Sequence, residues 1–591
     1  MNAVNSPIPA TDTPMPVPAT DTPMPRRTPI PATDAPPPRR TPSYPPHEAS
    51  SRRRILRYAV PRWMIERATE RRLTGDWRGA CAAANVDVAF DLADIANEHG
   101  GAVAAAVEDD LLHFAPDLLR WHLPRVLGGG WTTIRNFQRV TLSAAGEEYC
   151  LRVTTPATWE RPQRLRLSFE RIAGSGGYWA GTHNWATLRH LWDVRHTGEL
   201  LERHGGGDRP PFFDADGTLR PAGKLPTADP GPADPSAHTE WVTLLHERGE
   251  VEAAFAAVGI EVDPSPLQSG YAGLIDPLRV LEKLPVAPAR LEPELRRLIR
   301  AGLGHRFFIQ QPLPGSLLLE GDERAGGLRI RLVGGKKASG AAMLPEACWR
   351  RLPDLDVLRQ GDVDPDWLHP LVREALFPLR AEPAGPVGPP DPRLPSPFRV
   401  RCRGEWHELS FQDGALRMPH SAEEQRREQA LLAFGGRIAG CFAVQRAMRS
   451  EGGRLPKALR ELRRELFLRV QHGDTPGVLK LLDAGVDPRL RDGRDRTLLH
   501  ALIHLDHEVL LPRLLAAGLD LEAVDYKERT ALYVAVADDG SPALVRALLA
   551  AGANPRVTDE RDVSISELID DIERTDLDFV LTLLEQDEPA G

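Results

Sequence analysis

The sequence predicts a multidomain protein in three parts: a Pro-rich N-terminal arm without a fold, an α+β body of a type that no pattern names, and an all-α array of repeats at the C-terminus. Three observations lead to this prediction. The first 50 residues repeat a proline-dense motif, helix-type and strand-type patterns alternate through residues 56 to 455, and self-similarity at a fixed period begins after residue 460.

The N-terminal arm, residues 1–55, is a tandem low-complexity tract. PATDTPMP occurs at 9–16 and again at 18–25, and PATDAPPP follows at 31–38. Proline fixes φ and removes a backbone donor, and the tract has little apolar surface to bury, so we expect a disordered arm with polyproline II character. It is either a solvated tail or a ligand for a proline-reading module.

The body divides at two segments of linker composition. Residues 56–204 predict an α+β domain, with a β-hairpin at 137–155, a strand at 164–172, and a helix that places Trp185, Leu188 and Trp192 on one face. The remaining divisions are a Pro/Gly linker at 205–237, a mainly helical domain with one possible hairpin at 238–380, a Pro-rich linker at 381–397, and a β-hairpin plus long helix at 398–455.

Two local signals within the body are specific enough to test. Ser421 and Glu424 have the spacing of a capping box, which predicts a helix beginning there. GDWRGACAAANVDV (75–88) and GEVEAAFAAVGIEV (249–262) align without a gap, as an internal echo or by chance between two Ala-rich helices.

The array, residues 456–587, has a period of 33 and then 34 residues. Each unit closes on a glycine in LLDAG or LLAAG (Gly485, Gly518 and Gly552), and the next opens on a hydroxyl residue (Thr497, Thr530 and Ser564). Two well-formed units, 493–525 and 526–559, stand between two degenerate ones. This pattern resembles the ankyrin repeat over residues 460–587.

The resemblance implies a role for each landmark. Thr497 and Thr530 cap the first helix of their units, His500 hydrogen-bonds the turn and its neighbour, and the three glycines end helices in the left-handed conformation. It also implies a scaffold or adaptor whose partner is another protein. Its contacts would come from the loop tips, for which the candidates are Arg489, Arg494, Arg496, Tyr526, Lys527 and Arg529.

An enzyme reading is kept as the alternative. FFDADGTL (212–219) resembles the first motif of the haloacid dehalogenase superfamily, which implies a magnesium-dependent phosphatase with Asp214 as nucleophile and Asp216 as acid/base. Lys336 or Lys337 would be the later lysine, and Asp362 with Asp366 the metal pair. Only two apolar residues precede Asp214, and DADG is ordinary turn chemistry, so the sequence favours a binding protein without a cofactor.

Composition and charge limit the classes of function and the cellular compartments that fit the chain. The formal net charge is −9, but residues 465–591 hold 13 Lys plus Arg against 26 Asp plus Glu, so this end is −13 and the rest +4. An acidic array is a poor nucleic-acid binder. We expect a cytoplasmic protein, because no signal peptide or membrane-spanning run occurs. Its five scattered cysteines lack any CxxC pair, which predicts neither disulfides nor a zinc site.

Overall fold

The structure is a computed structural model, and it does not describe every residue. The N-terminal arm up to residue 45 lies outside the described part. The described ranges are 46–127, 132–146, 148–172, 182–269, 273–310, 315–321, 327–334, 340–361, 363–434, 439–448 and 455–586.

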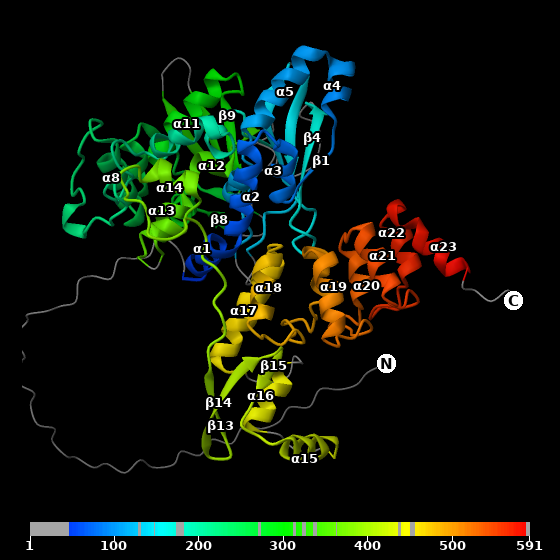
Figure 1. Ribbon diagram of the computed structural model, residues 1–591. Coiled ribbons are helices and arrows are strands. Elements are labelled where there is room, and N and C mark those ends of the chain that lie inside the picture. Colours follow the sequence, from blue (N-terminus) through cyan, green and yellow to red (C-terminus); the bar gives the residue numbers. More distant parts are fainter. Residues whose placement is uncertain are drawn as a thin grey trace, which may run out of the picture. The chain divides into compact units, whose positions relative to one another are not determined.

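The first half of the body combines helices with a five-stranded sheet of order β1-β4-β3-β2-β5 (Figure 1). β2 and β3 form the hairpin expected at 137–155, and β4 confirms the strand expected at 164–172. The helices are α1 (Pro46–Tyr58), α2 (Arg62–Leu73), α3 (Trp77–Ala83), α4 (Leu92–His99), α5 (Gly101–His113), α6 (Pro116–His122) and α7 (Leu200–Arg203). The strands are β1 (Val86–Val88), β2 (Arg139–Ala145), β3 (Tyr149–Thr154), β4 (Leu165–Arg171) and β5 (Thr182–Asn184).

The second half of the body holds more helix than strand, but it also contains another five-stranded sheet, of order β12-β9-β10-β11-β6. The possible hairpin expected within 238–380 is part of this sheet. The helices of this half are α8 (Pro235–Glu247), α9 (Val251–Ala256), α10 (Pro277–Lys283), α11 (Pro288–Arg300), α12 (Glu346–Trp349), α13 (Pro353–Leu358) and α14 (Pro370–Leu376). Its strands are β6 (Ile260–Val262), β9 (Arg306–Gln310), β10 (Ser316–Gly321), β11 (Leu328–Val333) and β12 (Ala342–Met343), with a separate ribbon of β7 (Leu267–Ser269) and β8 (Gly273–Ile275).

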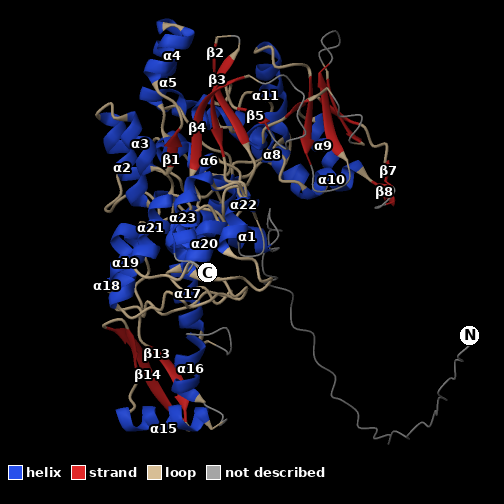
Figure 2. Cartoon of the chain, turned by 90° about the vertical axis from the view of Figure 1, so that its right-hand side faces the viewer, coloured by secondary structure: helices blue, strands red, loops and turns tan. Residues whose placement is uncertain are grey.

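The two sheets share one topology, which Figure 2 shows as two groups of strands in the body. In each sheet, a short edge strand after a helix pairs in parallel with the last strand of an antiparallel three-stranded meander, and a second short strand pairs in parallel with the first strand of that meander. The edge strand is β1 in one sheet and β6 in the other. This match indicates an internal duplication of the body.

The sequence echo falls at the same place in both copies. α3 with β1 comes from residues 75–88, and α9 with β6 comes from 249–262. The left-handed positions also coincide, because Gly75 (φ 77°) aligns with Gly249 (φ 82°), and Asn85 (φ 55°) aligns with Gly259 (φ 73°). The shared topology, together with the gap-free sequence match at the same place, favours an internal repeat over a chance resemblance.

One core runs through both halves and includes the segment that the sequence predicts as a linker. Phe212 and Phe213, within 205–237, are 4% and 1% exposed and pack into this core. Phe213 meets Phe377 edge to face, with ring centroids 5.7 Å apart. Proline and glycine therefore mark an irregular but packed segment here. The helix expected around Trp185 consists instead of two 3₁₀ turns, η1 (Arg189–Leu191) and η2 (Val194–Glu199), although Trp185, Leu188 and Trp192 are all buried.

A small module of three antiparallel strands and two helices follows the body and precedes the array. We call it the hairpin–helix module. It contains β13 (Phe398–Cys402), β14 (Glu405–Gln412) and β15 (Ala415–Arg417), then α15 (Ala422–Ala433) and α16 (Gly440–Met448). The capping box is present, because Ser421 N–H donates to Glu424 Oε2 at 2.9 Å and Glu424 N–H donates to Ser421 Oγ at 3.2 Å. The single long helix expected here is instead two helices.

Candidate functional site

The C-terminal array consists of four helix pairs, and the first member of the second pair is a 3₁₀ helix. The pairs are α17 (Lys457–Gln471) with α18 (Thr475–Asp483), η6 (His500–His504) with α19 (His507–Ala516), α20 (Ala531–Ala537) with α21 (Pro542–Ala550), and α22 (Ile565–Asp571) with α23 (Asp578–Gln586). A single apolar core runs through all four pairs.

The second helix of each of the first three pairs ends in the same way. Gly485, Gly518 and Gly552 have φ of 88°, 75° and 96°. In each case the glycine N–H donates to the carbonyl three residues back, and the next N–H donates to the carbonyl five residues back, as in Gly518 to Leu515 (2.9 Å) and Leu519 to Leu514 (3.2 Å). This is Schellman geometry, and it sends the chain into the next turn at the same angle each time.

His500 joins two neighbouring units. Its Nδ1 accepts the Thr497 N–H at 3.1 Å, so the ring proton is on Nε2, which donates to the carbonyl oxygen of Arg529 at 2.9 Å. Thr497 Oγ1 accepts the Leu499 N–H at 3.2 Å. Burial lowers the pKa of His500 to about 4, so the imidazole is neutral at physiological pH.

The next two units use other residues for the helix cap and for the contact between units. Thr530 Oγ1 accepts the Tyr533 N–H at 3.3 Å, and Ser564 forms a capping box with Glu567. Tyr533 stands where the preceding unit has His500. Burial and then Asp559 raise the pKa of Tyr533 to about 12, because its hydroxyl hydrogen-bonds that carboxylate in the following turn. The contact between units is therefore kept although the histidine is lost.

The turns between units are also linked edge to edge. Tyr526 N–H donates to Arg494 O at 3.1 Å, and Glu560 N–H donates to Lys527 O at 2.9 Å. Within each turn an aspartate accepts two backbone N–H groups; Asp525, for example, accepts from Lys527 (2.9 Å) and Arg529 (3.1 Å). The turns therefore form a continuous ladder along one edge of the array.

Residues 466–559 match the family model of ankyrin repeats, in three copies. The array is an ankyrin-repeat domain. A comparison of the chain with curated proteins gives no match. The match covers a segment only, and it includes neither the body nor the hairpin–helix module.

The ankyrin turns place the predicted tip residues in different settings. Arg529 is 7% exposed and its guanidinium is bound to Asp525 Oδ2 at 2.7 Å. Arg496 is paired in the same way with Asp492 (2.8 Å), and Arg489 with Asp487 (2.9 Å). These three arginines hold their own turns together. The sequence did not distinguish this role from partner binding.

Tyr526 and Lys527 are placed differently. The Tyr526 side chain is 43% exposed, its neighbour Val524 is 42% exposed, and the Lys527 ammonium lies 5.6 Å from the centre of the Tyr526 ring. We call Val524, Tyr526, Lys527 and Glu528 the tip patch. It presents an exposed aromatic ring, of the kind that protein interfaces favour at their centres, beside an aliphatic side chain and a cation.

The body contacts the ankyrin domain at several places, including a hydrogen bond from Thr132 to His472 at 2.7 Å and one from Trp63 Nε1 to Asp474 at 2.7 Å. Arg494, one turn before the tip patch, pairs with Glu160 of the β3–β4 connection, and Arg161 of the same connection lies 3.5 Å from Asp539. On α17, Glu465 is buried and accepts the Tyr58 hydroxyl of α1 at 2.6 Å. Part of the domain's surface is thus bound within the chain, and the tip patch lies beside the bound part.

The residues of the phosphatase alternative do not form a catalytic arrangement. Phe213, before Asp214, makes a single bridge to Leu219, so among the described strands Asp214 follows no sheet strand. Asp214 Oδ1 accepts Arg220 Nη1 at 2.9 Å. Lys336, Lys337 and Asp362 lie outside the described residues.

Asp216 and Asp366 do come near each other, through an arginine. Arg380 donates from Nε to Asp366 Oδ1 at 2.7 Å and from Nη1 to the Asp216 carbonyl oxygen at 3.2 Å. Hydrogen bonds from Arg380 and then Arg373 hold the pKa of Asp366 below its usual value against desolvation. A guanidinium therefore stands where the alternative would require a metal cation.

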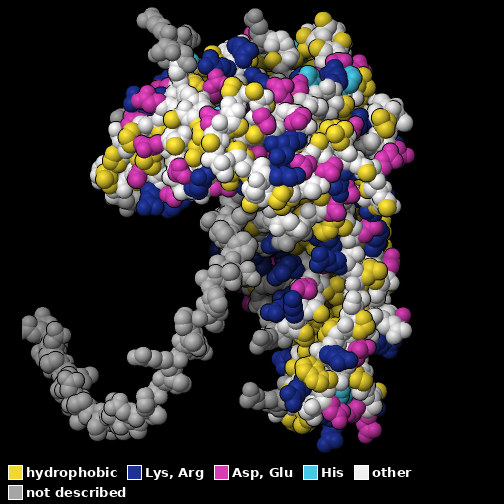
Figure 3. All heavy atoms as spheres, turned by 90° about the vertical axis from the view of Figure 1, so that its left-hand side faces the viewer, with side chains coloured by type: hydrophobic (Ala, Val, Ile, Leu, Met, Phe, Trp, Pro, Cys, Tyr) yellow, Lys and Arg dark blue, Asp and Glu magenta, His cyan; other side chains and the backbone are white. Residues whose placement is uncertain are grey.

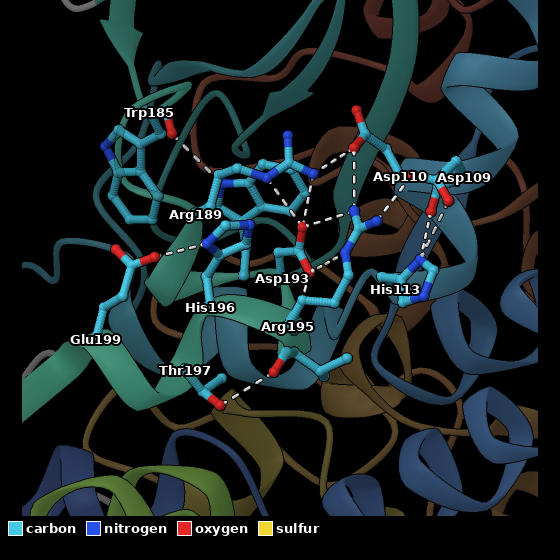
Figure 4. A network of polar contacts seen from close by, with 12 residues as sticks. Asp109, Asp110, His113, Trp185, Arg189, Asp193, Arg195, His196, Thr197 and Glu199 are labelled. Carbon is cyan, nitrogen blue, oxygen red and sulfur yellow. Dashed lines mark hydrogen bonds and ion pairs between the residues drawn. The ribbon is translucent and has the colours of Figure 1, made fainter.

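An ion network surrounds Asp193 at the start of η2 (Figure 4). Asp193 is fully buried and accepts Arg189 Nε and Arg195 Nη2, both at 2.9 Å, and Asp110 of α5 pairs with Arg189. Burial raises the pKa of Asp193, but hydrogen bonds from Arg195 and Arg189 more than offset this and the net shift is downward. Every carboxylate in the network faces a guanidinium, so it fastens η2 to α5.

The surface gives no sign of a single-sign field on the face drawn in Figure 3, where acidic and basic side chains are interspersed with hydrophobic ones. Nucleic-acid binders instead gather Lys and Arg along one face. Within the described ranges, no helix has the length and apolar character needed to cross a bilayer.

Proposed function

We propose that the chain is an adaptor that binds another protein through the tip patch of its ankyrin domain. Ankyrin repeats are protein-interaction modules, and the tip patch supplies the exposed aromatic side chain that such a contact needs. The observation that carries the proposal is the exposure of Tyr526 beside Val524 and Lys527, on a turn whose backbone is fixed by Asp525 and by the neighbouring turns.

The rigidity of this turn supports the proposal. Two backbone N–H groups are held by Asp525, and the turn is hydrogen-bonded on both sides to the turns of adjacent repeats. A partner that binds a preorganised turn loses little conformational entropy of the protein, so the exposed ring and cation contribute more of their contact energy to affinity. The body, fixed to α17, would then be the part that the adaptor brings to the partner.

The test is affinity capture from native lysate with the full chain as bait, beside Tyr526→Ala and Lys527→Glu. We expect a specific protein that the native chain retains and both variants lose, with binding at least about tenfold weaker for Tyr526→Ala, as truncation of an aromatic hot spot gives. Arg561→Glu reverses one charge on the following turn, outside the patch, and serves as the matched control. If the variants retain the same proteins as the native chain, the tip patch is not the binding surface.

A further inference from the structure

Four side chains with metal-binding atoms converge in the hairpin–helix module, which lies in the chain between the body and the ankyrin domain. They are Cys402 at the end of β13, His407 on β14, His420 just before α15, and Cys441 in the first turn of α16. One ligand atom from each lies within 4.8 Å of the others. Two thiols and two imidazoles in one place form the donor set of a structural zinc site.

The distances match the edges of a tetrahedron. Zinc–sulfur bonds of about 2.3 Å and zinc–nitrogen bonds of about 2.05 Å place sulfur and nitrogen ligands about 3.6 Å apart and two nitrogens about 3.3 Å apart. Cys402 Sγ lies 3.6 Å from His420 Nε2, and Cys441 Sγ lies 3.6 Å from His407 Nδ1. His407 Nδ1 and His420 Nε2 are 3.1 Å apart. The four atoms are already spaced to surround one small cation.

The local backbone explains this convergence. Arg403 and Gly404 both have positive φ, 52° and 93°, which makes the tight β13–β14 turn that brings Cys402 and His407 together. Gly440, with φ of 63°, passes so close that a Cβ there would lie 2.5 Å from Cys402 Sγ. Only a residue without a side chain allows this approach, and it sets Cys441 opposite Cys402.

Each imidazole also has a carboxylate at its other nitrogen. His420 Nδ1 lies 3.7 Å from Glu424 Oε2, and His407 Nε2 lies 3.9 Å from Glu405 Oε2. Glu424 is itself held by its capping box with Ser421. Carboxylates often stand behind metal-binding histidines and orient the ring. Here both are beyond hydrogen-bonding distance, and they lie on the side away from Nε2 of His420 and Nδ1 of His407, the two nitrogens that face the cysteines.

The module needs such a fastening because its core is small. Its main buried side chains, besides the two cysteines, are Val400, Leu409, Leu416, Phe442, Val444, Ala447 and Met448. A core of this size supports little independent stability, and small folds of this kind are commonly held by a metal or by disulfides. We propose that Cys402, His407, His420 and Cys441 bind one structural Zn²⁺ ion, which fastens the hairpin to α16.

The zinc would also act on the ankyrin domain, because the module caps its first repeat. The β14–β15 turn packs against the end of α18, where a Cβ on Gly485 would lie 3.1 Å from Asp413 N and from Gln412 Cα. At the end of α16, the Met448 carbonyl accepts the Arg491 N–H at 3.2 Å. Repeat arrays require a capping element at each end, and here the metal holds that element in shape.

Metal analysis of the purified full chain tests this assignment. We expect one zinc ion per chain, lost in Cys441→Ala and in His420→Ala. Cys81→Ala removes an equally buried thiol of the body and should keep its zinc. His407→Cys supplies another soft ligand and should also keep zinc, which separates loss of a ligand from loss of folding. Glu424→Gln should weaken zinc binding about tenfold, as removal of an outer carboxylate does.

Two further measurements use the same protein. Cobalt exchanged into the native full chain should give the visible absorption of a tetrahedral site with thiolate ligands. Removal of the metal by a chelator should raise hydrogen exchange in residues 398–448 and α18, while β3 of the body stays unchanged. The proposal fails if the reduced chain binds no zinc after reconstitution, if Cys441→Ala keeps its metal, or if Cys402 and Cys441 are found joined by a disulfide.

Discussion

His500 Nε2 donates to the carbonyl oxygen of Arg529 at 2.9 Å, and this bond joins two successive ankyrin repeats. Both partners are buried, so no water replaces the donor when the imidazole is removed. A buried group left without its partner costs about 1–3 kcal/mol. We expect His500→Ala to destabilise the domain by about that amount, measured as faster hydrogen exchange in η6 and α20 of the full chain. His507→Ala, on the more exposed start of α19, is the control, and an equal effect there would contradict the role of His500.

The ankyrin domain should lose stability in weak acid. His472 and His500 are buried and His504 is half-buried, and burial lowers the pKa of each, to about 4 for His500 and about 3 for His504. Between these values and an ordinary pKa of about 6.5, the unfolded chain binds protons that the folded chain does not. The contribution of these histidines to the free energy of unfolding is therefore complete above about pH 6.5. It is lost as the pH is lowered from there, by up to about 1.4 kcal/mol per pH unit for each histidine. Hydrogen exchange at about pH 7 and about pH 5, corrected for intrinsic rates, measures the loss. His504→Leu should reduce it, and a pH-independent stability would show these imidazoles to be solvated.

Glu528→Gly should stabilise the ankyrin domain. Glu528 has φ of 59°, and Asp495 and Asp562 share this conformation at equivalent places in their turns. A side chain in the left-handed region costs about 1 kcal/mol, which glycine avoids. The expected gain is about 0.5–1 kcal/mol, read from chemical denaturation followed by exchange of the α20 peptides. Lys527→Gly, at a position of negative φ in the same turn, should destabilise, because glycine gives the unfolded chain more freedom. An equal gain there would show that the effect does not depend on the left-handed conformation.

The phosphatase alternative predicts an activity that the geometry does not favour. Asp214 lies in a turn and is paired with Arg220, and Asp366 is held by Arg380. We expect the full chain with magnesium to release no phosphate from p-nitrophenyl phosphate beyond the rate of Asp214→Asn. A magnesium-dependent rate that disappears in Asp214→Asn but persists in Asp208→Asn would restore the enzyme reading.

The ankyrin domain was predictable because its landmarks answer local demands of the backbone. Gly485, Gly518 and Gly552 stand at left-handed helix ends, and Thr530 at a helix start, so each residue type reports its own geometry. The sequence did not separate the arginines that hold the turns from exposed tip residues. Arg529 and Lys527 read alike as cations, yet only the fold shows that Arg529 is buried against Asp525.

The rest of the fold depends on contacts between distant residues. β10 (SLLLEG) is a run of leucines without alternation, so its place between β9 and β11 was not visible in the sequence. The cysteine argument against zinc failed to consider ligands from separate elements, since Cys402 and Cys441 meet only when α16 packs on the hairpin. The spacing Cys402 to His407 across the turn CRGEWH was the one local signal available.

The hydrogen bond from Tyr58 to Glu465 joins α1 of the body to α17 of the ankyrin domain. Glu465 also accepts Arg469 Nη2 at 2.8 Å, so two partners besides Tyr58 remain charged and buried if it is removed, Arg57 being the other. Burial raises the pKa of Glu465, but Arg469 and then Tyr58 offset this and the net shift is downward, so the carboxylate is ionised in the interface. Breaking a buried pair from one side costs about 3–5 kcal/mol. Glu465→Ala should therefore raise hydrogen exchange in α1 and α17 together, while Glu461→Ala on the exposed face of α17 leaves both unchanged. Faster exchange confined to α17 would mean that the two parts are not held together at this carboxylate.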